Sequence, residues 1–216
     1  MKPKLKLSPT KPGCITIKQI VLASNNQGKL RELSAILQQL NVELIPQSEF
    51  NIPDAIEDGL SFVENAIIKA RHASGLSGLP AIADDSGIEV DALNGQPGIY
   101  SARYAGVQGA RQEVDQANND LLLKNLELVA EQDRTARFQC VLAFMRHAND
   151  PMPIISQGSW EGRILFEESG KNGFGYDPLF YVPTHGCASA ELEPAIKNTL
   201  SHRNQAIEQL IQQWPY

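Results

Sequence analysis

The chain has 216 residues, of which 42% are hydrophobic and 20% are charged, and its formal net charge is −6. This composition is ordinary for a globular protein that buries a hydrophobic core, and it excludes fibrous and wholly disordered proteins. Proteins that coat the nucleic-acid backbone favour a basic surface, so the negative charge argues against a nucleic-acid partner. A site that binds one small anion through a few cations remains compatible with this charge.

Three cysteines, Cys14, Cys140 and Cys187, are far apart and form no CxxC pair. The sequence therefore predicts neither a zinc site nor a disulfide framework, and free thiols fit a reducing compartment. No apolar run approaches the ~18 residues that a membrane span needs, and the start of the chain lacks the apolar stretch of a secretory signal. We therefore predict a cytoplasmic protein without a membrane partner, with a disordered tail over residues 1–17 and one domain over residues 18–216.

The first elements predict an α/β fold. Residues 19–24 form a short apolar run that predicts a buried strand, residues 30–40 carry apolar side chains at helical spacing, and residues 42–46 predict a second strand. A strand–helix–strand start is typical of α/β proteins. A further helix is predicted to begin at Ser61, because Ser61 and Glu64 have the spacing of a capping box.

The rest of the chain alternates strands and helices, which predicts one mixed sheet with a cleft between two lobes. Residues 80–83 predict a strand, residues 84–87 (DDSG) predict a sharp polar break, and residues 88–92 predict a short strand that returns from it. Further along, we predict a helix over residues 112–131, strands over 136–145 and 154–164, a glycine-rich loop over 170–178 and a final helix from Ser201.

A polar turn joins the first predicted strand to its helix and consists of Ser24, Asn25, Asn26, Gln27, Gly28 and Lys29. A helix N-terminus offers unpaired N–H groups and a partial positive charge, which suit phosphate. Lys29 would add a full charge, and Asn26 would add side-chain donors. The turn is not a Walker A loop, because Leu30 follows Lys29 where that loop has serine or threonine. Two interpretations stay open, a phosphate-binding turn and an ordinary turn with a solvated lysine.

Asp84 and Asp85 are adjacent carboxylates at the end of an apolar run. They repel each other and lose hydration unless a cation compensates them, and their hard oxygen atoms suit Mg²⁺. Together with Glu57 they suggest a magnesium site, and the alternative is an Asx-type turn that closes a hairpin. Lys69, on the helix that begins at Ser61, is either a structural counter-ion or a phosphate ligand, and its spacing alone favours the ion pair.

The glycine-rich loop contains the run Phe174, Gly175, Tyr176 and Asp177. Glycine allows a close approach of the backbone to a ligand, and an aromatic face can stack on a base. The alternative is that both aromatic side chains pack in the core. Lys197, His202 and Arg203 bring cationic side chains to the start of the last helix, and the histidines show neither metal-ligand spacing nor a nucleophilic triad.

Five ordered segments carry a resemblance to a known family: SNNQGKLREL, EDGLSFVENAIIKARHA, ADDSGIEVDALNGQPGIYSARYAG, GFGYDPLF and KNTLSHRNQA. Together they resemble the Ham1-type inosine triphosphate pyrophosphatases, from residue 19 to near the C-terminus. The resemblance implies an α/β fold with an elongated mixed sheet flanked by helices, and two lobes with a central cleft. It also implies a homodimer that uses Mg²⁺ to hydrolyse the non-canonical purine nucleotides ITP, dITP and XTP to the monophosphate and pyrophosphate.

The resemblance assigns a role to each candidate residue. Catalysis falls to Lys29, Lys69 and Asp85, with Asp85 as the general base or the carboxylate that organises the metal. The metal ligands are Glu57, Asp84 and Asp85. Substrate binding is assigned to the turn of Ser24, Asn25, Asn26, Gln27, Gly28 and Lys29, to Ser86, to Phe174, Gly175, Tyr176 and Asp177, and to Lys197, His202 and Arg203.

Base selectivity follows from the same assignment. Phe174 stacks on the base, Asp177 orients it, and the cationic residues near the last helix recognise the purine edge. Hydrogen-bond donors at that edge match the 6-keto group of hypoxanthine and xanthine, which accepts. The 6-amino group of adenine is itself a donor, so the donors of the site would have no acceptor there. The resemblance therefore implies ITP and XTP as substrates over ATP and, through crowding or a missing partner at the 2-amino group of guanine, over GTP. The rival interpretations are a related pyrophosphatase for modified pyrimidine or other nucleotides, and a non-catalytic nucleotide-binding module.

Overall fold

The computed structural model describes residues 17–26, 28–30, 33–34 and 41–214. Its α-helices with described bounds are α2 (Phe62–Ser77), α3 (Arg111–Asn125), α4 (Pro194–Leu200) and α5 (His202–Gln212). Its strands are β1 (Gln19–Leu22), β2 (Glu43–Pro46), β3 (Ala81–Val90), β4 (Thr135–Met145), β5 (Ile154–Ile164), β6 (Phe180–Val182) and β7 (Cys187–Ala188).

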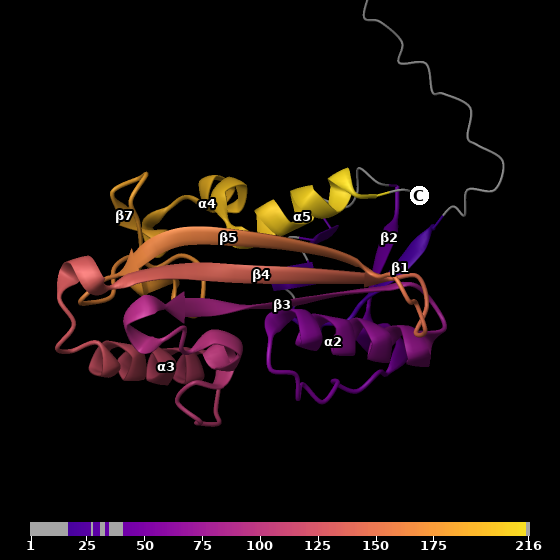
Figure 1. Cartoon of the computed structure of the whole chain (residues 1–216), viewed down its shortest axis with the longest axis horizontal. Coiled ribbons are helices and arrows are strands. Elements are labelled where there is room, and N and C mark those ends of the chain that lie inside the picture. Colours follow the sequence, from indigo (N-terminus) through magenta and orange to yellow (C-terminus); the bar gives the residue numbers. More distant parts are fainter. Residues whose placement is uncertain (1–16, 27, 31–32, 35–40, 215–216) are drawn as a thin grey trace, which may run out of the picture.

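One mixed sheet runs through the molecule in the order β2-β1-β3-β4-β5-β6-β7. β1 is parallel to both β2 and β3, and the other neighbouring strands are antiparallel. In Figure 1 the long strands β3, β4 and β5 run along much of the long axis of the molecule, with α2 and α3 on one side of the sheet and α4 and α5 on the other. The predicted α/β fold with an elongated mixed sheet is confirmed.

β3 continues through the acidic segment, so the predicted break at residues 84–87 is wrong. All ten of its residues pair with β4, from Ala81 opposite Met145 to Val90 opposite Ala136. On its other edge β3 pairs with β1 only as far as Ile82. The acidic residues therefore lie where β1 no longer covers the strand, and cations in the cleft compensate their carboxylates, so the chain has no need to turn there.

The two faces of β3 pack against different helices, because successive side chains of a strand point to opposite faces. On one face, Ile82 packs in a core cluster with Ile207 of α5. On the other face, Ala81 and Ala83 pack with Ala70 of α2. Side chains at even positions of this segment thus face α5, and those at odd positions face α2.

Helix α2 begins as the sequence predicts. The Ser61 hydroxyl accepts a hydrogen bond from the N–H of Glu64 (3.4 Å), and the Glu64 carboxylate accepts one from the N–H of Leu60 (2.9 Å). The last residue of the helix is Ser77, and Gly78 caps its C-terminus. The φ of 71° at Gly78 is the left-handed conformation that glycine adopts without strain. The predicted N-cap is confirmed, while Glu64 bonds the N–H of Leu60 and the Ser61 hydroxyl (2.7 Å) instead of closing the box on the N–H of Ser61.

The other helices differ in part from the expectation. α3 ends at Asn125 rather than near residue 131, because Leu126 is buried while Leu128 is 97% exposed, so the apolar spacing does not continue. Of the helix predicted over residues 30–40, residues 30, 33 and 34 are helical, and the rest lie outside the described residues. Residues 28 and 29, before the predicted start, are also helical. α4, β6 and β7 were not predicted, since elements this short show little periodicity.

The predicted tail lies outside the described residues except for Ile17, whose side chain is buried in the core cluster beside α5. Within the described ranges, no helix is long and apolar enough to cross a membrane. Cys140 is buried and Cys187 is half-buried, and both are free thiols, while Cys14 falls outside the described residues.

Candidate active site

The polar turn after β1 is closed by its own asparagine. Asn26 Oδ1 accepts hydrogen bonds from the N–H groups of Gly28 (2.8 Å) and Lys29 (3.2 Å), which makes Asn26 the N-cap of the helix that follows. These N–H groups, which the sequence suggested were free for phosphate, already have an acceptor. The clearest positive group that the turn offers to an anion is therefore the ammonium of Lys29.

The remaining residues of the turn support its shape. Ser24 Oγ accepts a hydrogen bond from the N–H of Asn26 (3.2 Å), and Asn25 Nδ2 donates to Asp54 Oδ1 (3.0 Å). Asp54 also accepts a hydrogen bond from Gln47 (2.7 Å), so the turn is tied to the segment after β2. Gln27, predicted as a phosphate ligand, lies outside the described residues.

Asp84 lies on the α5 face of β3 between two cations. Its Oδ2 is 2.8 Å from Lys29 Nζ and 3.7 Å from an Arg203 nitrogen, and its side chain is fully buried. Burial disfavours the ionised form, but Lys29 and Arg203 outweigh burial and hold the pKa of the Asp84 carboxyl well below its ordinary value. Asp84 is therefore an ionised counter-ion for these two residues, which favours a structural role over the predicted metal ligand.

Asp85 lies on the opposite face, beside α2. Its Oδ1 is 2.7 Å from Lys69 Nζ, and Glu57 Oε2 is 3.2 Å from the same nitrogen. Burial raises the pKa of the Asp85 carboxyl, and the ammonium of Lys69 opposes this rise. For Lys69 burial acts to lower the pKa, but the surrounding carboxylates, Asp85 first, outweigh it and raise that pKa. The three side chains form a compact group of two acids around one cation.

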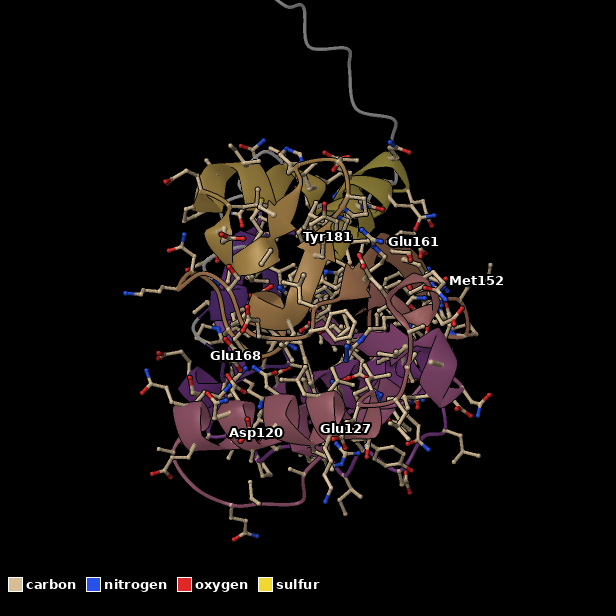
Figure 2. The ribbon with its side chains drawn as sticks, turned by 90° about the vertical axis from the view of Figure 1, so that its left-hand side faces the viewer. Asp120, Glu127, Met152, Glu161, Glu168 and Tyr181 are labelled. Atoms are coloured by element: carbon tan, nitrogen blue, oxygen red, sulfur yellow. The ribbon has the colours of Figure 1, made fainter. Side chains whose placement is uncertain are left out.

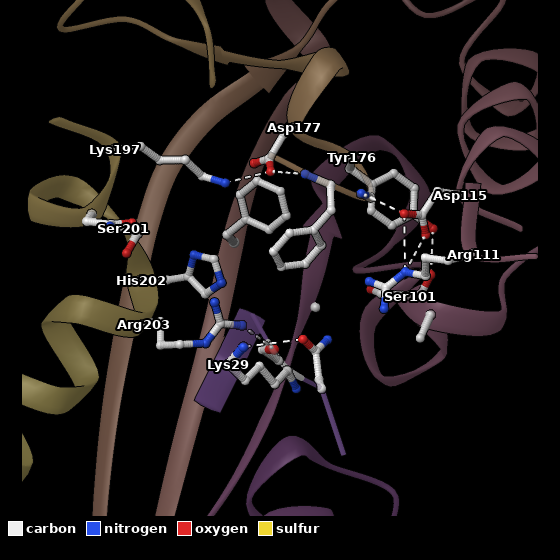
Figure 3. Close-up of a pocket in the computed structure, with 18 residues that line it drawn as sticks. Lys29, Ser101, Arg111, Asp115, Tyr176, Asp177, Lys197, Ser201, His202 and Arg203 are labelled. Atoms are coloured by element: carbon white, nitrogen blue, oxygen red, sulfur yellow. Dashed lines mark hydrogen bonds and ion pairs between the residues drawn. The ribbon is translucent and has the colours of Figure 1, made fainter. Parts of the chain in front are cut away.

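Two cavities open along the edge of β3, and Asn26 and Lys29 line both of them. The acidic cavity is also lined by Ser24, Asn25, Gln47, Asp54, Glu57, Lys69 and Asp84. The aromatic cavity is also lined by Ser86, Ser101, Arg111, Asp115, Phe138, Phe174, Tyr176, Asp177, Lys197, His202 and Arg203. Figure 3 shows the aromatic cavity, with Lys29, His202 and Arg203 on one side and Arg111 and Asp115 on the other.

The glycine-rich loop contributes one exposed and one buried aromatic residue. Phe174 is 40% exposed in the aromatic cavity, as a stacking platform requires. Tyr176 is 5% exposed, and its hydroxyl donates to the backbone oxygen of Ser101 (2.8 Å), so it also anchors the loop to the core. Tyr176 thus packs in the core, as one interpretation of the sequence had it, while the ring of Phe174 is accessible to a ligand.

Asp177 organises the same loop. Its Oδ2 accepts hydrogen bonds from the N–H of Phe174 (2.8 Å) and from Lys197 Nζ (2.5 Å), and its Oδ1 accepts one from the Ser189 hydroxyl (2.9 Å). The carboxylate is buried and has three donors, so it fixes the positions of Lys197 and Phe174.

His202 is buried and neutral at the start of α5. Its ring stacks on that of Phe138 at 4.9 Å with an angle of 14°, and its buried Nδ1 has no hydrogen-bond partner among the described residues. Burial, together with Arg203 and Lys197, holds the pKa of His202 well below its ordinary value. Next to it, Arg203 donates to the hydroxyl of Ser86 (3.3 Å), which joins α5 to the acidic segment of β3.

Several residues of the aromatic cavity were not predicted from the sequence, namely Ser101, Arg111, Asp115 and Phe138. Phe138 is a regular core residue of β4, and Arg111 and Asp115 resemble an ordinary surface pair of a helix. Local sequence gave no signal for them, since each reaches the cavity only through the packing of distant elements. Among the described residues, no group of three or more His, Cys, Asp or Glu side chains is arranged to hold a metal ion.

The family model described as the Ham1 family matches residues 20–213. This chain belongs to the Ham1 family. Among its Ham1-family relatives, a dITP/XTP pyrophosphatase from Vibrio parahaemolyticus is 59% identical over 197 residues, which cover 91% of this chain and 96% of the relative. A dITP/XTP pyrophosphatase from Coxiella burnetii is 53% identical over 192 residues, with 89% and 94% covered.

Solved structures of Ham1 proteins share the fold. A HAM1 protein from Coxiella burnetii superposes with a TM-score of 0.85 at 52% identity, over 91% of this chain and 98% of that one. The Ham1 protein from Staphylococcus aureus gives a TM-score of 0.80 at 43% identity, over 91% and 97%. The family that the five sequence segments suggested is confirmed.

Proposed function

We propose that this chain hydrolyses the non-canonical purine nucleoside triphosphates ITP, dITP and XTP to the monophosphate and pyrophosphate. The observation that carries the proposal is the junction of the two cavities at Lys29. An ammonium suits a phosphate chain, and the aromatic cavity offers Phe174 to a base. Glu57 and Lys69 line the acidic cavity, and Lys69 contacts Asp85 behind them. The names of the relatives from Vibrio parahaemolyticus and Coxiella burnetii agree with this activity.

The reaction is the attack of water on the α-phosphorus. The bond between that phosphorus and the oxygen that bridges to the β-phosphate breaks, and pyrophosphate leaves. Asp85 accepts the proton of the attacking water, as a carboxylate general base does. Lys29 and Lys69 offset the negative charge of the phosphate groups and stabilise the leaving pyrophosphate.

The acidic cavity also suits Mg²⁺. Asp85 and Glu57 both contact Lys69 Nζ, so their oxygen atoms already lie near one cation. One or two carboxylates are the number of protein ligands that Mg²⁺ usually takes when it also binds substrate phosphates. Asp85 and Glu57 would hold the ion, which would neutralise charge on the phosphates. Asp84 also lines this cavity, but Lys29 and Arg203 already compensate its carboxylate.

Base selectivity is proposed to lie in the α4–α5 wall of the aromatic cavity. Lys197, His202 and Arg203 present nitrogen donors there, and a 6-keto group accepts from such donors whereas the amino group of adenine does not. A site that relies on a buried hydrogen bond rejects a substrate lacking the partner by roughly 10⁴-fold. ITP, dITP and XTP are therefore the proposed substrates, and ATP is expected to react far more slowly.

A pyrophosphate-release assay tests the function, with ITP, dITP, XTP, GTP, ATP and a modified pyrimidine triphosphate, each with and without Mg²⁺. We expect release from the first three, dependent on Mg²⁺, and little from GTP or ATP. Comparable kcat/KM for all purine nucleotides would contradict the base selectivity. Faster turnover of the pyrimidine would favour the rival pyrophosphatase, and binding without release would indicate a non-catalytic module.

Two further expectations from the family resemblance are also proposals, a homodimer and a cytoplasmic location. Analytical ultracentrifugation of the full chain tests the first, and a sedimenting mass equal to one chain over the micromolar range contradicts it. Fractionation of the source cells tests the second.

A further inference from the structure

Helix α3 holds the glycine-rich loop from the side of the cavity opposite to α4 and α5. Asp115 Oδ2 accepts a hydrogen bond from the N–H of Gly175 (3.0 Å), and Asn119 Nδ2 donates to the carbonyl of the same residue (3.2 Å). Asn119 also donates to Glu168 (2.8 Å), which Figure 2 labels above α3 at this end of the molecule. The backbone directly after Phe174 is thus fixed by α3.

Arg111, at the start of α3, covers the ring of Phe174. Its guanidinium carbon lies 5.3 Å from the ring centroid, and both side chains line the aromatic cavity. Arg111 Nε donates to both oxygens of Asp115 (3.2 Å each), the residue that also holds Gly175. A cation in the first turn of a helix is unfavourable with the helix dipole, so helix stability does not account for an arginine here.

A second cation approaches the same ring but is held more firmly. Lys197 Nζ lies 5.4 Å from the Phe174 centroid and 2.5 Å from Asp177, and the side chains of this ion pair are 16% and 4% exposed. The Arg111 side chain is 58% exposed, and its pair with Asp115 has the i,i+4 spacing of a surface ion pair, which contributes little to stability. Arg111 is therefore the cation that can shift when a flat ligand lies against Phe174.

We propose that Arg111 closes over the purine base, so that the base lies between its guanidinium plane and the ring of Phe174. The proposal rests on the proposed function, because it takes the nucleotide base as the occupant of this cavity. A guanidinium is planar and stacks on aromatic faces, and bases stack on aromatic side chains and guanidinium planes alike. Asp115 is the positioning residue, since it orients Arg111 and holds the loop of Phe174.

The test compares Arg111→Ala with Arg103→Ala. Arg103 is a matched control, because its guanidinium lies 5.2 Å from the ring of Tyr100 and neither residue lines the cavity. For Arg111→Ala we expect the KM for ITP to rise roughly 3- to 30-fold, the range for loss of a cation–π contact, with kcat nearly unchanged. Arg103→Ala should leave both constants unchanged. Arg111→Lys should recover part of the loss, since it keeps the charge but not the plane.

Inorganic tripolyphosphate separates the base from the phosphates, because it has no base. Its inhibition constant should be the same for the wild type and Arg111→Ala. An unchanged KM for ITP in Arg111→Ala overturns the proposal, as does a tripolyphosphate inhibition constant that rises in parallel with that KM. If the wild type releases no pyrophosphate from ITP, the proposed function fails. In that case calorimetric titration with IMP tests whether Arg111 contacts the base. A lower affinity of Arg111→Ala for IMP would support the contact, and equal affinities of the wild type and the variant would overturn it.

Discussion

Asp84 and Asp85 are adjacent in the sequence, yet they pair with different lysines on opposite faces of β3. Asp84 is 2.8 Å from Lys29, and Asp85 is 2.7 Å from Lys69. The alternation of side chains along a strand separates them, so that one acid belongs to the α5 face and the other to the α2 face. The two carboxylates therefore have different environments and different expected roles, which substitution can distinguish.

Asp85→Asn should lower kcat for ITP by about 10²- to 10⁴-fold, because an amide cannot accept the proton of the attacking water. The thermal midpoint should stay close to that of the wild type, since Lys69 keeps Glu57 as a partner. Asp91→Asn is the control, because Asp91 pairs with Arg137 at the surface and lines neither cavity. Turnover of Asp85→Asn within a few-fold of the control would refute the role of the base.

Asp84→Asn should act mainly on stability. The substitution leaves Lys29 and Arg203 without their buried counter-ion, and breaking a buried ion pair in this way costs about 3–5 kcal/mol. Urea denaturation at pH 7 measures the loss, which for the exposed pair of Asp91→Asn should stay below about 1 kcal/mol. Because the pKa of Asp84 is held low in the folded state, its contribution is present at neutral pH and is lost only under strongly acidic conditions. Equal losses in the two variants would contradict the buried counter-ion.

His202 should make stability depend on pH below about 6.5, the ordinary value for histidine. Its folded pKa is depressed, so the unfolded chain takes up a proton that the folded chain refuses, and stability falls as the pH drops. The free energy of unfolding of the wild type should fall by up to about 1.4 kcal/mol more per pH unit than that of His202→Gln. Urea titrations at pH 7.0, 6.0 and 5.5 measure this difference, and parallel pH dependences would show that His202 titrates normally.

Gly87→Ala should destabilise the protein by about 1–3 kcal/mol, as overpacking does. A Cβ atom at this position would lie 2.5 Å from both the carbonyl oxygen of Gly98 and the hydroxyl oxygen of Ser101. Gly75→Ala within α2 is the matched control, because its Cβ would meet Ala148 at an ordinary 3.6 Å and alanine favours a helix by up to about 1 kcal/mol. Thermal unfolding of both variants measures the contrast, and a Gly87→Ala midpoint at or above the wild-type value would contradict the close packing there.

Local features of this protein could be predicted from its sequence because they depend on residues within one or two turns of each other. The N-cap at Ser61 is such a feature, and so are the apolar runs of β1, β4 and β5. The ordered motifs identified the family because they preserve the residue types of the site. The acidic segment was predicted as a turn because its polarity was visible, while the lysines that compensate it were not.

Contacts between distant elements were decided by the tertiary structure alone. Asp115 meets Gly175 across 60 residues, and Arg203 meets Ser86 across 117. Neither helix periodicity nor strand alternation specifies which faces of distant elements come together, because that depends on how the whole sheet and its helices pack. The sequence by itself thus determined the chemical groups of the site and most of its secondary structure. Only the packed fold determined which acid meets which lysine, and that α3 reaches the cavity at all.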